Sequence, residues 1–230
     1  MSTAAIFPDQ SPVESLPVFA VALTTCKLPH VGVIFWWKKS VWLLHLAGHN
    51  SLKLDKADTA LPNRYGWVVP QVPEMELKQL ASFARVQAKN KDKNTDIPFS
   101  FRYAPPPAEY RYTRGGQAQF FIMHGFTCAT FVMSIFDWIM VPLIDHASWT
   151  LRPNDEFSQL NLIPYIAQRG ASHQHLLDAA NEIPCIRFRP QEVAAACLSA
   201  ARPVNMKRAE ELATELDQDM TDFYVRVGVI

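Results

Sequence analysis

The stretch HVGVIFWWKKSVWLLHLA, residues 30–47, contains two apolar runs separated by a short polar break. Residues 31–37 and residues 41–47 are rich in β-branched and aromatic side chains, which favour strands. The polar tripeptide Lys-Lys-Ser lies between the two runs. We therefore expect an antiparallel β-hairpin over these residues.

Downstream of this hairpin, the pattern predicts a strand over 65–69, a helix over 74–88 and a strand over 97–103. The Pro-rich run APPPA, residues 104–108, predicts a rigid connector of polyproline type. The long apolar stretch over 126–144 has the length of a membrane span, but Asp137 lies in its middle and a charge there costs a few kcal/mol. We expect a buried helix that begins near Cys128.

The C-terminal third is expected to be helical. Its last helix carries an apolar stripe with acidic residues opposite, as a surface helix does. The predicted fold class is α+β. Helices are predicted near residues 156–168, 172–181, 190–201 and 205–224, and the chain divides into an irregular arm (1–18), a main body (19–146) and a helical region (147–230) packed on or beside it.

Composition narrows the functional classes. The chain has 230 residues, with Lys and Arg totalling 22 and Asp and Glu totalling 22, so its formal net charge is zero. A nucleic-acid binder usually carries a basic excess, so no nucleic-acid partner is expected. Glycine is scarce, at 8 residues, and no phosphate-binding glycine motif occurs. No cofactor is expected.

The four cysteines form no CxxC pair, and they are expected to be reduced thiols. The first twenty residues lack an early Lys or Arg and are interrupted by three prolines, so they predict no secretory signal. We expect a protein that is cytoplasmic as synthesised, with membrane association not favoured. Any export would need a dedicated secretion system.

One set of residues predicts chemistry. His30 opens the first strand of the hairpin and His45 lies near the end of the second, so antiparallel pairing makes them neighbours. Cys128 lies where an apolar helix begins, and the free N–H groups there favour a thiolate and lower the cysteine pKa. A nearby imidazole could take the thiol proton, and a second polar group could orient that imidazole.

The motifs around these residues resemble those of NlpC-type cell-wall peptidases and of the lecithin:retinol acyltransferase group. HVGVIF and WLLHLAGH are similar to the two strands in which a His opens one strand and a polar residue ends the next. TCATFV, residues 127–132, looks like the Cys motif of the permuted branch, in which His precedes Cys. This chain has Thr127 in place of the usual Asn, and its hairpin lacks the usual Gly-containing turn.

The resemblance implies a circularly permuted papain-like fold, with an antiparallel sheet packed on the Cys-bearing helix. It implies Cys128 as nucleophile, His30 as base and His45 as the orienting residue, with His49 left open as the third member. The Cys128 N–H would contribute to an oxyanion hole. Candidate oxyanion or substrate residues are Gln117, Gln119 and Trp36.

The expected reaction is cleavage of an amide or ester through an acyl-enzyme, by a hydrolase or an acyltransferase. Cell-wall peptide amides are the first substrate class, as for a bacterial effector or toxin, and lipid esters are an alternative. A non-enzymatic interaction module, docking a protein partner through the C-terminal helices, is the contrasting interpretation. A structural zinc site remains open as well, because Cys26, His30, His45 and His49 have nearly zinc-finger spacing.

Overall fold

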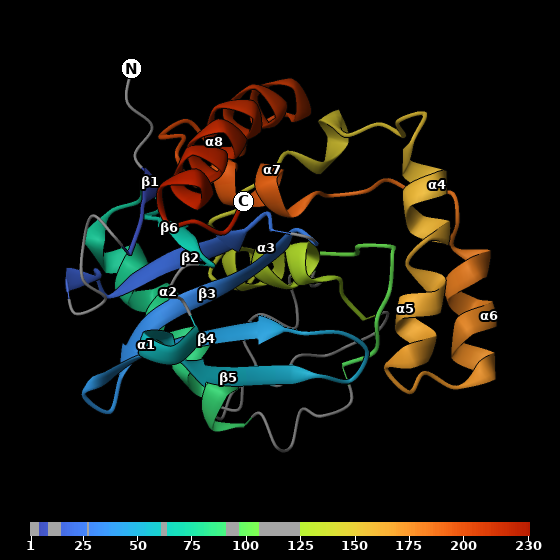
Figure 1. Ribbon diagram of the computed structural model, residues 1–230, viewed down its shortest axis with the longest axis horizontal. Coiled ribbons are helices and arrows are strands. Elements are labelled where there is room, and N and C mark those ends of the chain that lie inside the picture. Colours follow the sequence, from blue (N-terminus) through green and yellow to red (C-terminus); the bar gives the residue numbers. More distant parts are fainter. Residues whose placement is uncertain (1–4, 9–14, 27, 61–63, 91–96, 106–124) are drawn as a thin grey trace.

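The strands of the computed structural model form one antiparallel six-stranded sheet in the order β1-β6-β2-β3-β4-β5 (Figure 1). The structure describes residues 5–8, 15–26, 28–60, 64–90, 97–105 and 125–230. The strands are β1 (Ala5–Ile6), β2 (Phe19–Thr24), β3 (His30–Trp37), β4 (Ser40–Leu46), β5 (Leu52–Lys56) and β6 (Gly66–Val68).

The predicted hairpin is confirmed as β3 and β4, which pair from Trp37 opposite Ser40. The two turn residues, Lys38 and Lys39, have φ values of 50° and 63°. Positive φ at both central residues is the two-residue hairpin geometry that matches strand twist. Lys38 and Lys39 therefore form a two-residue hairpin turn without glycine. The Lys38 ammonium lies 4.3 Å from the centre of the Trp37 ring.

The central strand β2 was not predicted. All six of its residues, FAVALT, are buried, and it pairs with β3 on one side and β6 on the other. A strand that is buried on both faces has no polar alternation, which is the pattern that sequence reasoning relies on. The arm at 1–18 is not wholly irregular either, because Ala5 and Ile6 pair with β6 as the edge strand β1.

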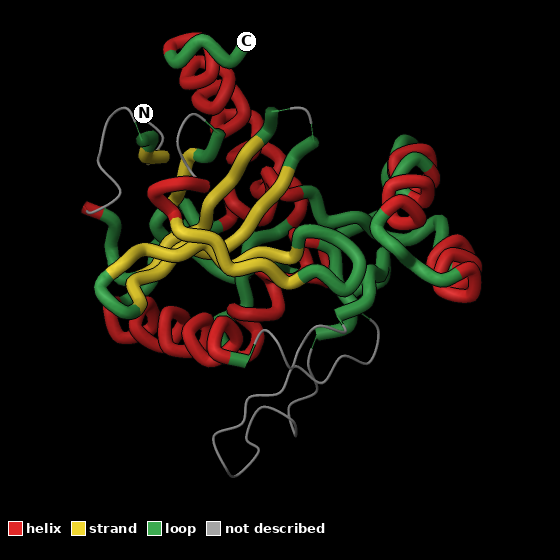
Figure 2. Tube along the Cα trace, turned by 60° about the horizontal axis from the view of Figure 1, so that its bottom comes forward, coloured by secondary structure: helices red, strands yellow, loops and turns green. Residues whose placement is uncertain are grey.

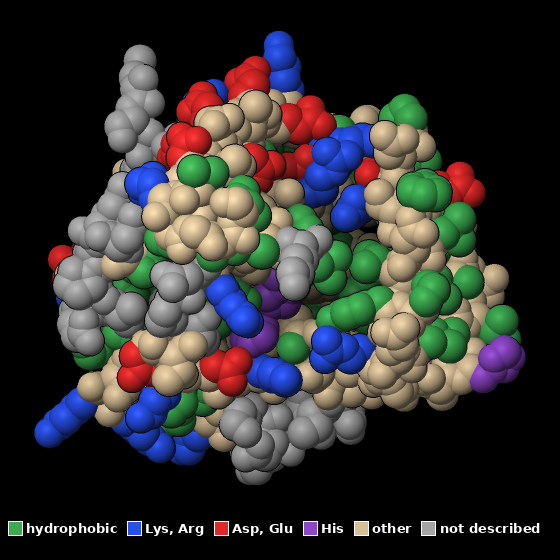
Figure 3. All heavy atoms as spheres, viewed as in Figure 1, with side chains coloured by type: hydrophobic (Ala, Val, Ile, Leu, Met, Phe, Trp, Pro, Cys, Tyr) green, Lys and Arg blue, Asp and Glu red, His purple; other side chains and the backbone are tan. Residues whose placement is uncertain are grey.

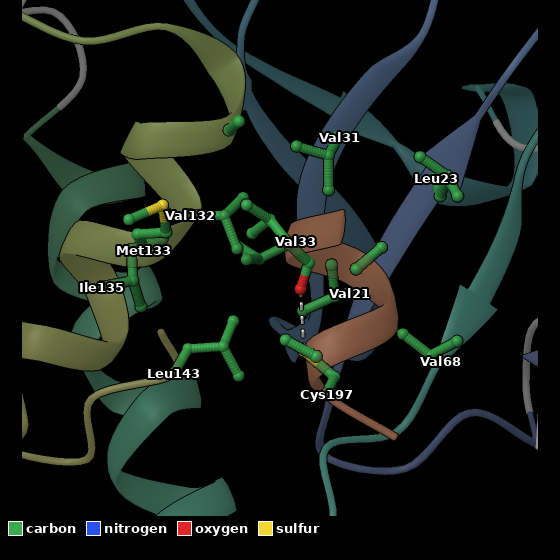
Figure 4. Close-up of a cluster of buried hydrophobic side chains, with 14 of the residues drawn as sticks. Val21, Leu23, Val31, Val33, Val68, Val132, Met133, Ile135, Leu143 and Cys197 are labelled. Carbon is green, nitrogen blue, oxygen red and sulfur yellow. Dashed lines mark hydrogen bonds between the residues drawn. The ribbon is translucent and has the colours of Figure 1, made fainter. Parts of the chain in front are cut away.

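Helices cover both faces of the sheet, as Figures 1 and 2 show. One face carries Val31, Val33 and Phe35, and they pack in the main core with α2 (Glu74–Lys89), α3 (Cys128–Trp138) and α7 (Pro190–Ala196). In Figure 4 the apolar side chains of β2 and β3 point toward α3 and α7. The opposite face, with Ile34 and Leu43, packs beside the short helix α1 (Ala57–Ala60).

The apolar stretch over 126–144 forms a buried helix, as predicted. Its helical part, α3, has 11 residues, and Asp137 near its end accepts a hydrogen bond from the Tyr103 hydroxyl. Among the described helices, none is both long enough and apolar enough to cross a membrane.

The helical third agrees with prediction except that the segment expected over 156–168 forms two helices. Figures 1 and 2 show α4, α5 and α6 as a group beside the sheet, whereas α8 packs along α7. The elements here are α4 (Asp155–Leu160), α5 (Ile163–Gln168), α6 (His173–Asn181) and α8 (Met206–Arg226), with a 3-10 turn at His146–Ser148.

The strand expected over 97–103 is not formed. The Glu182 carboxylate, at the end of α6, accepts the backbone N–H groups of Phe101 and Arg102 and the hydroxyl of Ser100. The Glu182 side chain thus satisfies backbone N–H groups that would otherwise pair with a neighbouring strand. The phenyl ring of Phe101 packs with residues of α5 and α6, so this segment ties the helical group to the sheet.

An ionic cluster joins the helices of the C-terminal third. The guanidinium of Arg152, 10% exposed, lies 2.6 Å from the Glu192 carboxylate on α7 and 2.8 Å from that of Glu210 on α8. Asp155, at the start of α4, is fully buried and lies 4.0 Å from the same group. Removing one partner of such a cluster leaves buried charges uncompensated.

Arg152→Met is therefore expected to lower the free energy of unfolding by about 3 kcal/mol. The control is Arg208→Met, which breaks an exposed pair with Glu211 on α8 and should change stability by less than about 0.5 kcal/mol. Urea denaturation followed by circular dichroism measures both. Equal losses of unfolding free energy in the two variants would show that the buried cluster contributes no more to stability than an exposed ion pair.

Candidate functional site

Three side chains from adjacent strands form a hydrogen-bonded chain. His30 Nε2 on β3 lies 2.8 Å from His45 Nδ1 on β4, and His45 Nε2 lies 3.0 Å from Asp55 Oδ2 on β5. The predicted juxtaposition of the two histidines is confirmed. Asp55 was missed, although the alternating sequence LKLDK directly after the hairpin could have indicated a third strand with its acid on the histidine face.

A glycine makes this arrangement possible. A Cβ on Gly32 would lie 2.7 Å from the Cβ of His45 and 2.9 Å from the Leu44 carbonyl oxygen. Contacts that short do not occur between real side chains, so any other residue at this position would displace β4. The backbone of β3 can therefore approach His45 closely, and His30 reaches it diagonally across the two strands.

The hydrogen-bonding capacity of these groups fixes the tautomers. A carboxylate only accepts, so His45 must donate from Nε2 to Asp55. The neutral His45 ring then accepts at Nδ1, which requires His30 to donate from Nε2. The remaining nitrogen of His30, Nδ1, is left with its lone pair and can accept a proton.

Both imidazoles are held in their neutral form. Burial and, to a smaller extent, the nearby His45 together lower the pKa of His30 to about 3. Burial also lowers the pKa of His45, although the hydrogen bond and charge of Asp55 act in the opposite direction. At neutral pH the pair is therefore an uncharged base backed by one carboxylate.

Cys128 is the first residue of α3, as expected. Thr127 caps the helix by accepting the Thr130 N–H, and the Thr130 hydroxyl accepts the Thr127 N–H in return. This reciprocal cap explains how Thr serves in place of Asn. Before it, Gly125 has a φ of 88°, and a Cβ there would lie 2.3 Å from the Pro98 carbonyl oxygen.

The expectation that the helix start lowers the Cys128 pKa is wrong in its net effect. Burial raises the pKa of this thiol by more than its neighbours lower it. The lowering comes from the backbone N–H groups of Val31, Ala129 and Cys128 itself, and from the charge of Arg187. The N–H groups at the helix start do lower the pKa of Cys128, but the apolar surroundings of the sulfur raise it by more.

Cys128 and His30 line the same cavity, which has a volume of about 100 Å³. The two residues approach it from different sides, because the histidines belong to the face of β3 and β4 opposite α3. The N–H of Val31, directly after His30 in the chain, interacts with the Cys128 thiol. His30 makes its hydrogen bond to His45. The thiol and the imidazole both line the cavity beside the start of β3, and burial favours the neutral form of each.

Arg187 is a further member of this cavity that sequence reasoning missed. Its neighbours Arg152 and Arg189 lie within 4.0 Å of the carboxylates of Asp155 and Glu192. Within the described ranges, the guanidinium of Arg187 makes no such pair. It is thus a half-buried positive charge near the thiol, in a segment without a recognisable motif.

The other predicted site residues lie elsewhere. Gln117 and Gln119 fall outside the described residues. The Trp36 indole donates to the Leu16 carbonyl and packs beside the α1 face, and it lines neither the Cys128 cavity nor the neighbouring cleft. His49 accepts the Phe99 N–H, with its ring centre 4.2 Å from that of His175, so His45 is the partner of His30.

The zinc-ligand arrangement is not present either. In the part of the chain that the structure describes, no three or more His, Cys, Asp or Glu side chains are grouped to hold a metal ion. His30 and His45 direct ring nitrogens at each other, and His49 is directed at Phe99.

Comparisons with known proteins identify no relative. No family model matches the chain, and neither a curated protein nor a solved structure is significantly similar to it.

The neutral state of His30 predicts a pH dependence of stability. In the unfolded chain His30 binds a proton below its ordinary pKa of about 6.5, whereas the folded group stays neutral down to about 3. Stability that is present above pH 6.5 is therefore lost as the pH falls toward 3. Between pH 7.5 and 4.5, this group accounts for a loss of up to about 3 kcal/mol.

His30→Gln should remove that part of the loss, as measured by urea denaturation at the two pH values. The control is His173→Gln, which changes an exposed histidine at the start of α6 and should keep the wild-type difference. If His30→Gln lost as much unfolding free energy between pH 7.5 and 4.5 as the wild type does, the buried neutral state of His30 would be contradicted.

Proposed function

We propose that the protein is a cysteine-dependent hydrolase or acyltransferase that cleaves an amide or ester through an acyl-enzyme. The observation that carries the proposal is the single cavity lined by both a free thiol at a helix start and the end of an imidazole relay. A structural histidine pair would not require a carboxylate behind it and an open cavity in front of it.

The reaction follows from the tautomers. His30 Nδ1 accepts the proton of the Cys128 thiol, directly or through one water, as the sulfur attacks the acyl carbon. His45 and Asp55 stabilise the resulting imidazolium. As the tetrahedral intermediate collapses, the bond to the leaving group breaks and that group takes the proton from His30. Water or a second nucleophile then attacks the thioester and frees Cys128.

Negative charge forms on sulfur and then on the acyl oxygen during these steps. The N–H groups of Cys128 and Ala129, in the first turn of α3, and the charge of Arg187 all favour negative charge at this point. Because the resting thiol and imidazole are neutral, the site forms its thiolate during the reaction and does not hold a preformed ion pair.

The permuted papain-like fold is part of this proposal. Three features support it: His30 precedes Cys128 in the chain, the histidines lie on a hairpin of an antiparallel sheet, and α3 packs on that sheet. Within this class, cell-wall peptide amides are the first substrate candidate and lipid esters the second. Delivery as a bacterial effector or toxin is part of this proposal, because it would bring such an enzyme to a cell-wall substrate.

A protein partner that docks on the helical region is a separate proposal. Large apolar side chains are exposed there, with Phe157 70% exposed and Leu160 49% exposed on α4, and Leu177 46% exposed on α6. Such side chains in one helical group favour a contact surface.

The nucleophile is tested by incubating the protein with p-nitrophenyl hexanoate, which traps the acyl-enzyme. The mass of the intact protein is then measured by mass spectrometry. We expect one added hexanoyl group on Cys128 and its absence in Cys128→Ala. The control is Cys26→Ser, which changes a partly buried free thiol that lines the neighbouring cleft and should leave labelling intact. Labelling that persists in Cys128→Ala would remove Cys128 as the nucleophile.

Asp55→Asn tests the relay. An amide can donate as well as accept, so it no longer fixes the His45 tautomer, and His30 Nδ1 is no longer reliably free of a proton. We expect kcat to fall by about tenfold or more with little change in KM, since the carboxylate stabilises charge that forms only in the transition state.

The matched control for the relay is Asp58→Asn, which removes the same charge three residues later, on α1, without a contact to His45. It should retain activity. Equal activity losses in the two variants would indicate a general charge effect and would count against the relay.

A further inference from the structure

We propose that the leaving group of the substrate is an anion, carrying a carboxylate or a phosphate, and that its acyl part is apolar. This inference rests on the proposed function and adds the substrate class. It comes from two adjoining hollows that differ sharply in chemistry and share His30 as a common wall.

The first hollow is the Cys128 cavity described above, and its walls are mainly apolar. Besides the thiol it is lined by Leu46, Phe99, Leu162 and Phe188, among other residues. Most of this surface offers no hydrogen-bond partner to a polar acyl group, and Arg187, the cation in the described lining, is assigned in the proposed reaction to the charge on the acyl oxygen. An apolar acyl group is therefore the part of a substrate that fits beside the sulfur.

The second hollow is an open cleft of about 1270 Å³ on the histidine face of the sheet. It contains His45 and Asp55 as well as His30. The proton that His30 Nδ1 takes from the thiol is delivered from the same nitrogen, so the leaving atom lies near both Nδ1 and the sulfur. The rest of the leaving group has room in the open cleft, which adjoins the cavity at His30. The geometry therefore assigns the acyl part to the cavity and the leaving group to the cleft.

The described side chains that line the cleft carry mainly positive charge. Among the described residues that line it, four are cations and one is an acid, Asp55, which already accepts a hydrogen bond from His45. Figure 3 shows this face, with histidine side chains near its centre, Lys and Arg side chains around them and Asp or Glu side chains among these. The four cations are Lys53, Lys56, Arg64 and Arg169.

These cations are free to bind a ligand. With respect to the described acids, none of the four lies within 4.0 Å of a carboxylate oxygen, whereas Lys78 and Arg208 elsewhere on the surface do. Arg169 makes one further contact, over the Tyr165 ring at 5.0 Å, and this leaves its guanidinium edge available. The chain as a whole is neutral, so the excess is local to this cleft.

A cleft lined by one sign of charge concentrates ligands of the opposite sign and accelerates their association. Charge-assisted hydrogen bonds from Arg then hold a carboxylate or phosphate in place. Carboxylate and phosphate share this chemistry, and a matched series of substrates separates them.

The test uses hexanoyl phenyl esters that differ only in the para substituent of the leaving phenol. The substituents are carboxylate, phosphonomethyl, neutral carboxamide and cationic aminomethyl, and each enzymatic rate is divided by the rate of alkaline hydrolysis of the same ester. We expect kcat/KM for an anionic ester to exceed that for the carboxamide by about tenfold, and the ratio to fall with added salt. The better of the two anionic esters identifies the group.

The double variant Arg64→Gln/Arg169→Gln removes two of the four cations. It should lower this ratio severalfold, because it reduces kcat/KM for the anionic ester more than kcat/KM for the carboxamide ester. The control is Lys78→Met, which removes an exposed cation on α2 and should keep the wild-type ratio. A wild-type ratio near one, or a ratio that the double variant does not change, would overturn the inference.

A binding measurement separates this inference from the proposed function. Calorimetry with Cys128→Ser compares 4-hydroxybenzoate with 4-hydroxybenzamide, which are the released leaving groups. Tighter binding of the benzoate without turnover of any ester by the wild type would retain the anion site and reject the enzyme. Turnover through Cys128 without a preference for anions would retain the enzyme and reject the anion site.

Discussion

Strand register is the constraint on which the site depends. The antiparallel pairing of β3 with β4, and of β4 with β5, places one polar residue from each strand on the same face and within reach of the next. The missing side chain of Gly32 lets His45 lie against β3. A slip of one residue would turn the polar side chain of the slipped strand toward the apolar core. Burial of the apolar side chains that face α3 therefore holds the register, and the register in turn holds the three polar residues together.

Burial sets the electrostatics of the site. A helix start and a neighbouring imidazole are often taken to imply a thiolate, but the pKa of Cys128 is raised and that of His30 is lowered. Both shifts have the same main cause, the loss of hydration in an apolar cavity. At rest the thiol and the imidazole are thus both neutral. In the proposed reaction, the first turn of α3, Arg187 and the Asp55 carboxylate stabilise the charge that develops.

Local patterns predicted much of the fold, and tertiary contacts account for the rest. The hairpin, α2, α3 and the last helix follow from periodicity and capping residues near in sequence. The strand β2 was not apparent because burial on both faces removes alternation. The segment after Pro98 has the composition of a strand, but Glu182, eighty residues later, satisfies its backbone donors. For the same reason the site was predicted only in part. His30 and His45 lie on one hairpin, whereas Arg187 reaches the cavity from a distant segment that carries no motif.

The neutral composition of the chain conceals an uneven distribution of charge. Three acids of the helical third are paired within it, since Glu192, Glu210 and Asp155 surround Arg152. The cations of β5 and of the adjoining segments face the cleft, where the one lining acid serves His45. A net charge of zero argues against a general polyanion binder, but a small site that binds an anion needs only a local excess of cations. The distribution of charge relative to the base, rather than its sum, is the property that bears on the substrate.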